Sequence, residues 1–351
     1  MKVRVAVVAS IAFLAPMIST AAIAFPFRIP PAVLIWGQLQ LNGQAASPIS
    51  DIDYTHQIQT VGGQTAKILC RGSLRTIDRT STFTLDDVCP EAAQTIERDG
   101  VEVPLRGGND QSIPFIISPR KTKLLSSRPF ISWNAVETSD FYSVTLLGPE
   151  GRVWSRTSES AEMPYPSDES SLEEGVNYAI KVTTSLGVSS DEGIPGLAFS
   201  VMSQDEQRQV EMAMTQLSEN GLTAEAKAYA EAYTYQNYGL LTEAITIFES
   251  LEQNISLNSD SYHFLGSLYE EVRLNYHARD FYLKALEIAE EQKHEIAKAK
   301  AFYSLGNIHI VLGNIPKAIS YLEQSQEIYL ALEGEESRRG EIIENQLSIF
   351  Q

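Results

Sequence analysis

Apolar side chains recur every three to four positions through the last third of the chain, which is the period of amphipathic helices. Between residues 225 and 325 one pattern occurs three times: a small residue, an aromatic residue or His three positions later, Ala after nine more, and a bulky residue after another four. The three copies are Ala232-Tyr235-Ala244-Phe248, Gly266-Tyr269-Ala278-Tyr282 and Gly306-His309-Ala318-Leu322. This regularity predicts three pairs of closely packed helices.

The copies repeat at a nearly constant interval. Ala244 and Ala278 are 34 residues apart, and Ala278 and Ala318 are 40 apart. A period near 34 with this pattern resembles the tetratricopeptide repeat, a helix-turn-helix unit. The resemblance implies an all-helical solenoid over residues 204–351, with a capping helix at either end. Its repeats are expected near residues 225–258, 259–298 and 299–332.

Turn and cap residues stand where such helix pairs need them. Gly239 and Gly313 suit the left-handed conformation that ends a helix, and Pro316 suits the first turn of the next one. Residues 204–218 and 337–350 carry apolar positions at helical spacing, so we expect them to cover the two ends of the solenoid.

Residues 111–203 alternate between apolar and polar positions with the period of β-strands. The residues predicted to share strand faces are Ile131 and Trp133, then Tyr142, Val144 and Leu146, then Tyr178, Ile180 and Val182. The run from Leu172 to Tyr178 resembles the turn before the sixth strand of fibronectin type III or immunoglobulin-like sandwiches, where a Tyr hydroxyl pins the corner. The region lacks Cys, and therefore the disulfide of antibody domains, which favours the fibronectin type.

Residues 25–110 are expected to form a small β domain. The expected elements are strands at Ala32–Gln40, Ala66–Cys70 and Ser81–Leu85, a turn at Gly62-Gly63 and a linker at 107–110. The glycine turn, the short strand ending in Cys70 and the later Cys89-Pro90 resemble FecR-like envelope modules.

Cys70 and Cys89 are the only cysteines of the chain. An even number of cysteines in an exported protein predicts a disulfide. That bond would close a loop of about 19 residues and contribute about 3 kcal/mol of stability. Two buried free thiols are the alternative.

Residues 1–24 have the three parts of a secretory signal. Lys2 and Arg4 give a positive start, residues 5–14 form an apolar core, and Ala22-Ile23-Ala24 is a small-x-small cleavage site. The alternative is an uncleaved membrane anchor, because the apolar run reaches about 20 residues, near the length that spans a bilayer. Contact with the membrane is expected only in that second case.

The charge of the chain narrows the classes of partner. The full sequence has a formal net charge of −18, and removing residues 1–24 leaves 25 basic and 45 acidic residues, a net charge of −20. A chain this acidic repels phosphate backbones and anionic lipid headgroups. General nucleic-acid binding is therefore excluded.

The sequence carries no recognisable catalytic motif. His294-Glu295 opens a zinc-protease pattern, but Lys298 occupies the position of the second His. His309 replaces a packing aromatic residue and is expected to be structural, and Asp86-Asp87 reads as a solvated turn. We therefore expect no enzyme, no metal and no cofactor, with an unrecognised site in the β domains as the alternative.

The resemblance to tetratricopeptide proteins also implies a binding surface. In that family the first helix of each pair lines a concave groove that holds an extended peptide or a partner helix. The matching positions are Tyr229, Tyr233, Gln236, Asn237, His263, Ser267, Glu270, Tyr303 and Asn307. Aromatic rings beside amides suit a peptide backbone. Packing against neighbouring helices is the alternative for Tyr229 and Tyr303.

Together these features predict a non-enzymatic scaffold of the bacterial envelope, periplasmic or extracellular, that binds a protein or peptide through its helical solenoid. The fold class is multidomain, with a small β domain, a β-sandwich and an all-α solenoid in that order. The alternative function is adhesion or carbohydrate binding by the β modules, with the helices as a docking platform.

Overall fold

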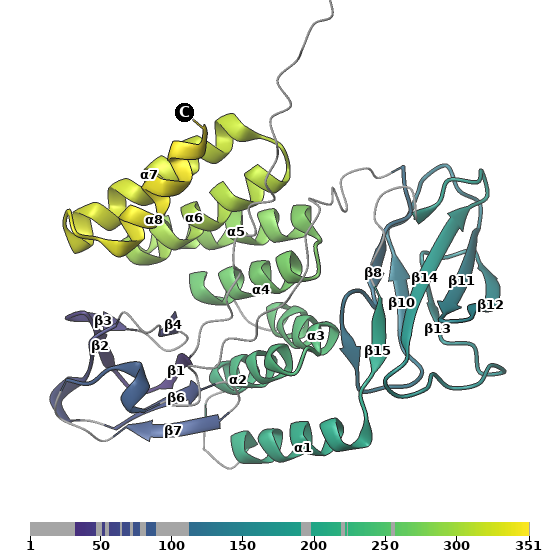
Figure 1. Cartoon of the computed structure of the whole chain (residues 1–351), viewed down its shortest axis with the longest axis horizontal. Helices are drawn as coiled ribbons and strands as arrows, with labels where there is room; N and C mark the ends of the chain where they lie inside the picture. The colour runs from purple at the N-terminus through teal and green to yellow at the C-terminus, as the bar shows by residue number, and fades with distance from the viewer. Residues whose placement is uncertain are drawn as a thin grey trace, which may run out of the picture.

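The computed structural model shows three regions along the chain (Figure 1). The residues it describes are 32–46, 51–52, 56–63, 65–70, 73–77, 82–88, 112–190, 198–218, 222, 224–253 and 257–350. The signal segment 1–24, the linker at 107–110 and the pairing of Cys70 with Cys89 fall outside this description. Within the described ranges no helix has the length and apolar character needed to cross a membrane.

The first region, here called the small β module, holds two antiparallel sheets. Their strands are β1 (Ala32–Trp36), β2 (Leu39–Leu41), β3 (Gln44–Ala46), β4 (Asp51–Ile52), β5 (Ile58–Thr60), β6 (Ala66–Cys70) and β7 (Ser73–Ile77). The strand orders are β4-β1-β6-β7 and β3-β2-β5. Leu34, Ile58 and Ile68 belong to one buried core shared by both sheets. The prediction of a strand at Ala66–Cys70 is confirmed.

The predicted strand at Ala32–Gln40 is two strands, because the chain turns at Gly37. This glycine has a φ of +93°, and a Cβ atom there would lie 2.7 Å from the carbonyl oxygen of Thr65. Only glycine fits such a position without displacing the neighbouring backbone.

The predicted strand at Ser81–Leu85 is wrong. Phe83 makes a single bridge with Ile58, and the chain then enters a 3-10 turn at Leu85–Asp87. The carboxylate of Asp87 accepts hydrogen bonds from the backbone N–H of Thr84 at 2.8 Å and from its hydroxyl at 3.0 Å. This local capping outcompetes the strand, because short polar side chains offer the backbone an alternative to ladder pairing.

The second region, the larger β region, packs two sheets around one core. Its strands are β8 (Ile116–Ser118), β9 (Lys123–Leu124), β10 (Phe130–Trp133), β11 (Tyr142–Gly148), β12 (Gly151–Ser158), β13 (Glu162–Pro164), β14 (Asn177–Thr184) and β15 (Phe199–Val201). The sheet orders are β13-β10-β8 and β12-β11-β14-β15-β9, with β15 and β9 parallel. Every residue predicted to share an inward face is buried: Ile131, Trp133, Tyr142, Val144, Leu146, Tyr178, Ile180 and Val182.

The turn before β14 is fixed as the sequence predicted. The hydroxyl of Tyr178 accepts a hydrogen bond from the backbone N–H of Glu173 at 3.1 Å. A second tyrosine acts similarly, because the hydroxyl of Tyr142 accepts from the N–H of Val136 at 2.8 Å. Each contact holds a loop onto the strand that the loop enters, β14 for Tyr178 and β11 for Tyr142.

The third region is helical. Its helices are α1 (Gln204–Ser218), α2 (Ala224–Asn237), α3 (Leu241–Glu252), α4 (Ser259–Glu271), α5 (Asn275–Glu291), α6 (Glu295–Val311), α7 (Ile315–Glu333) and α8 (Arg338–Leu347). Gly239 and Gly313 have φ values of +76° and +75°, and Pro316 lies in the first turn of α7, as predicted. The helices α2–α3, α4–α5 and α6–α7 form successive antiparallel pairs, with α1 and α8 at the ends (Figure 1).

The small residues of the repeat pattern lie where two helices touch. A Cβ atom on Gly266 would come within 2.7 Å of the Tyr282 ring, and one on Gly306 would come within 2.6 Å of the Leu322 side chain. Ala278 and Ala318, on the facing helices, are fully buried. Close approach of the paired helices therefore depends on these small side chains.

We expect Ala278→Leu to destabilise the helical region by about 1–3 kcal/mol, because three extra carbon atoms overpack this contact. Thermal melting of the full chain, followed by the helical circular dichroism signal, measures the effect. Ala331→Leu, the same substitution at an exposed position of α7, is the control. Equal melting temperatures for the two variants would contradict the assigned repeat frame.

Candidate functional site

The predicted binding residues lie on α2, α4 and α6, the first helices of the three pairs, and we call this surface the α2–α4–α6 face. Its members differ in exposure. Four are buried: Tyr229, Tyr233, Gln236 and Ser267. Five are half-buried: Asn237, His263, Glu270, Tyr303 and Asn307. Apart from Asn237, whose side chain is used within its own helix, the second group is the part of the predicted set that a partner could reach.

Tyr229 and Tyr233 belong to the core between repeats. The ring centroid of Tyr229 lies 4.7 Å from that of Phe264 and 5.7 Å from that of Phe248. The ring of Tyr233 lies 6.4 Å from Phe264. At 1% and 0% exposure neither ring is open to a partner. For Tyr229 this is the packing alternative, and for Tyr233 the expected place on an open surface is corrected. Aromatic rings of this size contribute most when buried between helices, which explains the outcome.

Asn237 also turns away from any partner. Its side-chain amide donates to the backbone carbonyl of Tyr233 on the same helix at 2.9 Å. The side chain is therefore engaged within the last turn of α2.

A polar network joins α4, α5 and α6 at the centre of the face. Nε2 of His263 lies 2.8 Å from the hydroxyl of Ser304, and its ring lies 5.1 Å from that of Tyr282. Burial, reinforced by the charge of Lys300, lowers the pKa of His263 well below its usual value. The ring is therefore neutral and acts as a hydrogen-bonding group rather than as a cation.

Glu270 lies at the end of this network. The hydroxyl of Tyr282 donates to its carboxylate at 2.6 Å. Burial raises the pKa of Glu270 to about 7, although the hydrogen bond from Tyr282 acts in the opposite direction. This carboxyl group consequently exchanges its proton near neutral pH.

Two amides extend the polar row towards both ends of the helical region. The side-chain amide of Gln236 donates to Glu271 at 3.0 Å, and that of Gln346 on α8 donates to Asn307 at 2.6 Å. The carbonyl oxygens of Gln236 and Gln346 are buried without a hydrogen-bond partner among the described residues. Sequence reasoning missed Gln346 because it treated the last helix only as a cap, whereas α8 continues the layer of first helices.

Sequence reasoning also missed Arg120, which joins the larger β region to the helices. This side chain is 1% exposed. Its guanidinium donates to the carbonyl oxygens of Val272 at 2.6 Å, Ile116 at 3.0 Å and Arg273 at 3.2 Å. Val272 caps the C-terminus of α4, where helix carbonyls are unpaired and the helix dipole favours a cation. No periodic pattern marks an arginine of this kind in the sequence.

The environment of Arg120 is costly for its charge. Burial lowers its pKa to about 9, and the nearby charge of Arg273 acts in the same direction. The three carbonyl oxygens replace water as hydrogen-bond acceptors, which makes a buried cation tolerable.

The residues that follow Arg120 bind the turn between α2 and α3. The hydroxyl of Thr122 accepts from the N–H of Leu241 at 2.9 Å, and the N–H of Lys123 donates to the carbonyl of Gly239 at 2.8 Å. Lys123 also pairs with Glu206 of α1 at 2.5 Å, which lowers the pKa of Glu206 to about 2. One segment of the larger β region thus touches three helical elements.

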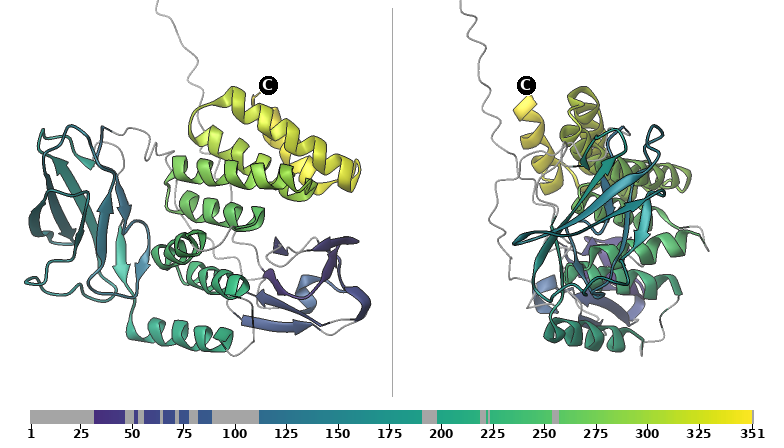
Figure 2. Two further views of the ribbon diagram at one scale, coloured as in Figure 1. Left: turned by 180° about the vertical axis from the view of Figure 1, so that it is seen from behind. Right: turned by 90° about the vertical axis from the view of Figure 1, so that its right-hand side faces the viewer.

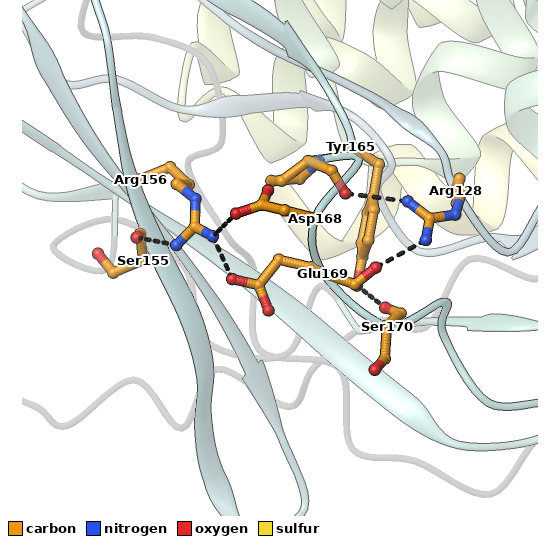
Figure 3. Close-up of polar contacts among 8 residues, drawn as sticks. Arg128, Ser155, Arg156, Tyr165, Asp168, Glu169 and Ser170 are labelled. Atoms are coloured by element: carbon orange, nitrogen blue, oxygen red, sulfur yellow. Dashed lines mark hydrogen bonds and ion pairs between the residues drawn. The ribbon is translucent and has the colours of Figure 1, made fainter.

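A second polar cluster lies inside the larger β region (Figure 3). Arg128 donates to the carbonyls of Pro166 at 2.9 Å and Glu169 at 2.6 Å, while Arg156 pairs with Asp168 and Glu169. The hydroxyl of Tyr165 donates to the carbonyl of Ser170. These hydrogen bonds and ion pairs hold the loop at 166–171 against the sheet.

Two further candidates for chemistry are His309 and a metal site. His309 is buried and its ring stacks on that of Tyr321 at 5.5 Å, in agreement with a structural role. Across the described ranges, no group of three or more His, Cys, Asp or Glu residues is arranged to hold a metal ion.

We call the contact of residues 115–123 with the helices the joint. We expect Arg120→Met to weaken the joint by about 2 kcal/mol, because the substitution leaves buried carbonyls without donors. Hydrogen–deuterium exchange of residues 112–125 and 269–275 in the full chain should increase. Arg128→Met, which removes a guanidinium that also binds carbonyls, is the control and should loosen only the loop at 166–171. Unchanged exchange in Arg120→Met would contradict the joint.

The pKa of Glu270 gives a pH-dependent prediction. Its value in the folded chain, about 7, is above the ordinary value of 4.5, so the folded state binds this proton more tightly. The resulting stabilisation is present at acidic pH and is lost as the pH rises through 7. Glu270→Gln keeps a neutral acceptor for Tyr282, so we expect it to raise stability at pH 8 by about 2 kcal/mol and to change little at pH 4.

Melting curves of the full chain across this pH range test the prediction. Glu287→Gln, at an exposed position of α5, is the matched control. If the difference in melting temperature between Glu270→Gln and wild type does not increase with pH, Glu270 ionises as an ordinary surface carboxylate and the prediction is wrong.

The family comparison agrees with the helical architecture. A family model described as "Tetratricopeptide repeat" matches residues 259–292 and 299–331, which correspond to the pairs α4–α5 and α6–α7. No curated protein matches the chain.

Solved structures show limited similarity to the same part of the chain. BtubC (BKLC) from P. vanneervenii is 22% identical over 41% of this chain and 62% of that chain, with a TM-score of 0.34. PcrH from Pseudomonas aeruginosa is 17% identical over 37% of this chain and 94% of that chain, with a TM-score of 0.31. The match thus spans less than two thirds of BtubC. The C-terminal part of the present chain contains tetratricopeptide repeats, preceded by a β-rich part.

Proposed function

We propose that this chain is a non-enzymatic scaffold that binds a protein or peptide partner through the α2–α4–α6 face. The observation that carries the proposal is the row of half-buried polar residues on successive first helices of the repeats. This row contains His263, Glu270, Tyr303 and Asn307. Repeats of this kind stack into extended surfaces, and each repeat adds a few side chains to the same side.

The chemistry of the row suits a polypeptide ligand. Tyr303 offers an aromatic ring, and Asn307 offers an amide that can pair with backbone N–H and C=O groups. Glu270 can accept a hydrogen bond as a carboxylate or donate one as an acid, because its pKa is about 7. These properties favour recognition of a peptide backbone over catalysis.

We further propose that the chain is exported to the cell envelope, with the small β module similar to FecR-like modules and the larger β region similar to fibronectin type III or immunoglobulin-like sandwiches. The charged start and cleavage site within residues 1–24 support export. N-terminal sequencing should find a mature chain that begins near Phe25; a mature chain that retains Lys2 would indicate an anchor.

A second candidate function is adhesion by the larger β region, either to a protein or to a carbohydrate. Phe141 and Leu186 are 44% and 70% exposed. Their loops are joined, because Asp140 N–H donates to the hydroxyl of Ser185 and Ser185 N–H donates to that of Ser139, both at 3.1 Å. Exposed apolar side chains held in place in this way are a feature of contact surfaces.

Substitution of Tyr303 separates the two functions. We expect Tyr303→Ala in the full chain to weaken partner capture from the native envelope by about 2 kcal/mol, as loss of a central aromatic contact does. Leu283→Ala, at an exposed position of α5, is the control. A melting curve of each variant must accompany the capture, because Tyr303 also packs against its neighbours.

The outcomes point to different surfaces. Reduced capture with normal melting supports the α2–α4–α6 face. Capture that survives Tyr303→Ala but is lost in Phe141→Ser would assign binding to the larger β region instead.

A further inference from the structure

The small β module packs against the helical region at widely separated places. Strand β1 lies against α2, strand β7 lies against α1, and His56 contacts Arg339 of α8. Figure 1 and the left view of Figure 2 show the module beside α2. Segments from the two ends of the chain are therefore held together.

The contact between His56 and Arg339 is well defined. Nη2 of Arg339 lies 2.9 Å from Nε2 of His56, and His56 is 6% exposed. A guanidinium can only donate, so the histidine ring accepts through an unprotonated nitrogen. Arg339 is itself positioned by an ion pair with Glu333 at 2.5 Å and lies 5.3 Å above the ring of Tyr329. Contacts within the helical region therefore position Arg339 for His56.

The two anchor helices belong to the layer that carries the candidate site. α2 begins the layer of first helices, and α8 continues it, since Gln346 of α8 binds Asn307 of α6. A module that touches both α2 and α8 therefore reaches from one end of the α2–α4–α6 face to the other.

We propose that the small β module is an intramolecular ligand of the α2–α4–α6 face, and that a partner must displace it to bind. The proposal rests on the proposed function, because it concerns the regulation of the same face. A protein whose binding-competent form is a minor population shows an apparent affinity reduced by that fraction. The module would set the affinity of the chain through the strength of its contacts with α2 and α8.

The first test measures docking and needs no partner. In the full chain, His56→Ala removes the acceptor for Arg339 and leaves every helix unchanged. We expect hydrogen–deuterium exchange of α8 to rise about tenfold, the effect of losing one hydrogen bond to a charged group. Gln57→Ala, at the adjacent exposed position, is the control.

A double-mutant cycle protects this test against indirect effects. Arg339→Ala should raise exchange in residues 56–63, and the double variant with His56→Ala should add little further, because both remove one contact. Additive effects, or unchanged exchange of α8 in His56→Ala, would overturn docking through this pair.

The second test measures competition, with the partner captured by the wild-type chain as the probe. Release of the module should strengthen binding of that partner to His56→Ala by up to about tenfold, and Gln57→Ala should bind as wild type does. If His56→Ala increases the exchange of α8 but leaves partner binding unchanged or weaker, the module does not compete with the partner, and the proposed function still stands. If Tyr303→Ala does not affect capture, the proposed function fails, and the regulatory role fails with it even where exchange shows docking.

Discussion

The arrangement of the larger β region and the helices depends on one buried cation. Arg120 is removed from water, yet all three of its hydrogen bonds go to carbonyl oxygens and none to a carboxylate. A buried charge is costly unless strong acceptors replace its water. Two of the three acceptors, Val272 and Arg273, lie at the end of α4, because carbonyls elsewhere in a helix are already paired. The cation therefore fixes the β region to the C-terminus of α4 and to no other part of that helix.

The remaining contacts of this joint follow from the position of Arg120. Thr122 and Lys123 follow it closely in the sequence and bind the turn at Gly239, Thr122 through its hydroxyl and Lys123 through its backbone N–H. Phe115 enters the core of the helical region from the other side of Arg120. Buried backbone hydrogen bonds and a shared core make a rigid joint. The small β module is attached to α8 by a side-chain hydrogen bond and to α1 and α2 by strand contacts.

Local patterns predicted most of the fold. Small residues such as Gly266 and Gly306 mark the helix contacts because any side chain there would collide with the partner helix. The alternation through Tyr142 and Tyr178 marks the buried strand faces for a similar reason. The strand expected at Ser81–Leu85 failed because Asp87 caps a turn, a local hydrogen bond that competes with alternation. The candidate site was harder to predict, because the burial of Tyr233 and the role of Arg120 depend on segments distant in the sequence.

The repeat architecture also determines the chemistry of the face. The bulky position that fills each helix pair is Phe248 in the first repeat, Tyr282 in the second and Leu322 in the third. Only the second supplies a hydroxyl, and that hydroxyl binds Glu270 at 2.6 Å. The same ring packs against Gly266, so its position is fixed by the helix contact rather than by the carboxyl group. Burial raises the pKa of Glu270 to about 7 even though this hydrogen bond favours the carboxylate. Phe248 and Leu322, at the equivalent positions of the other repeats, have no hydroxyl to donate, so a carboxyl group buried there would lack this partner.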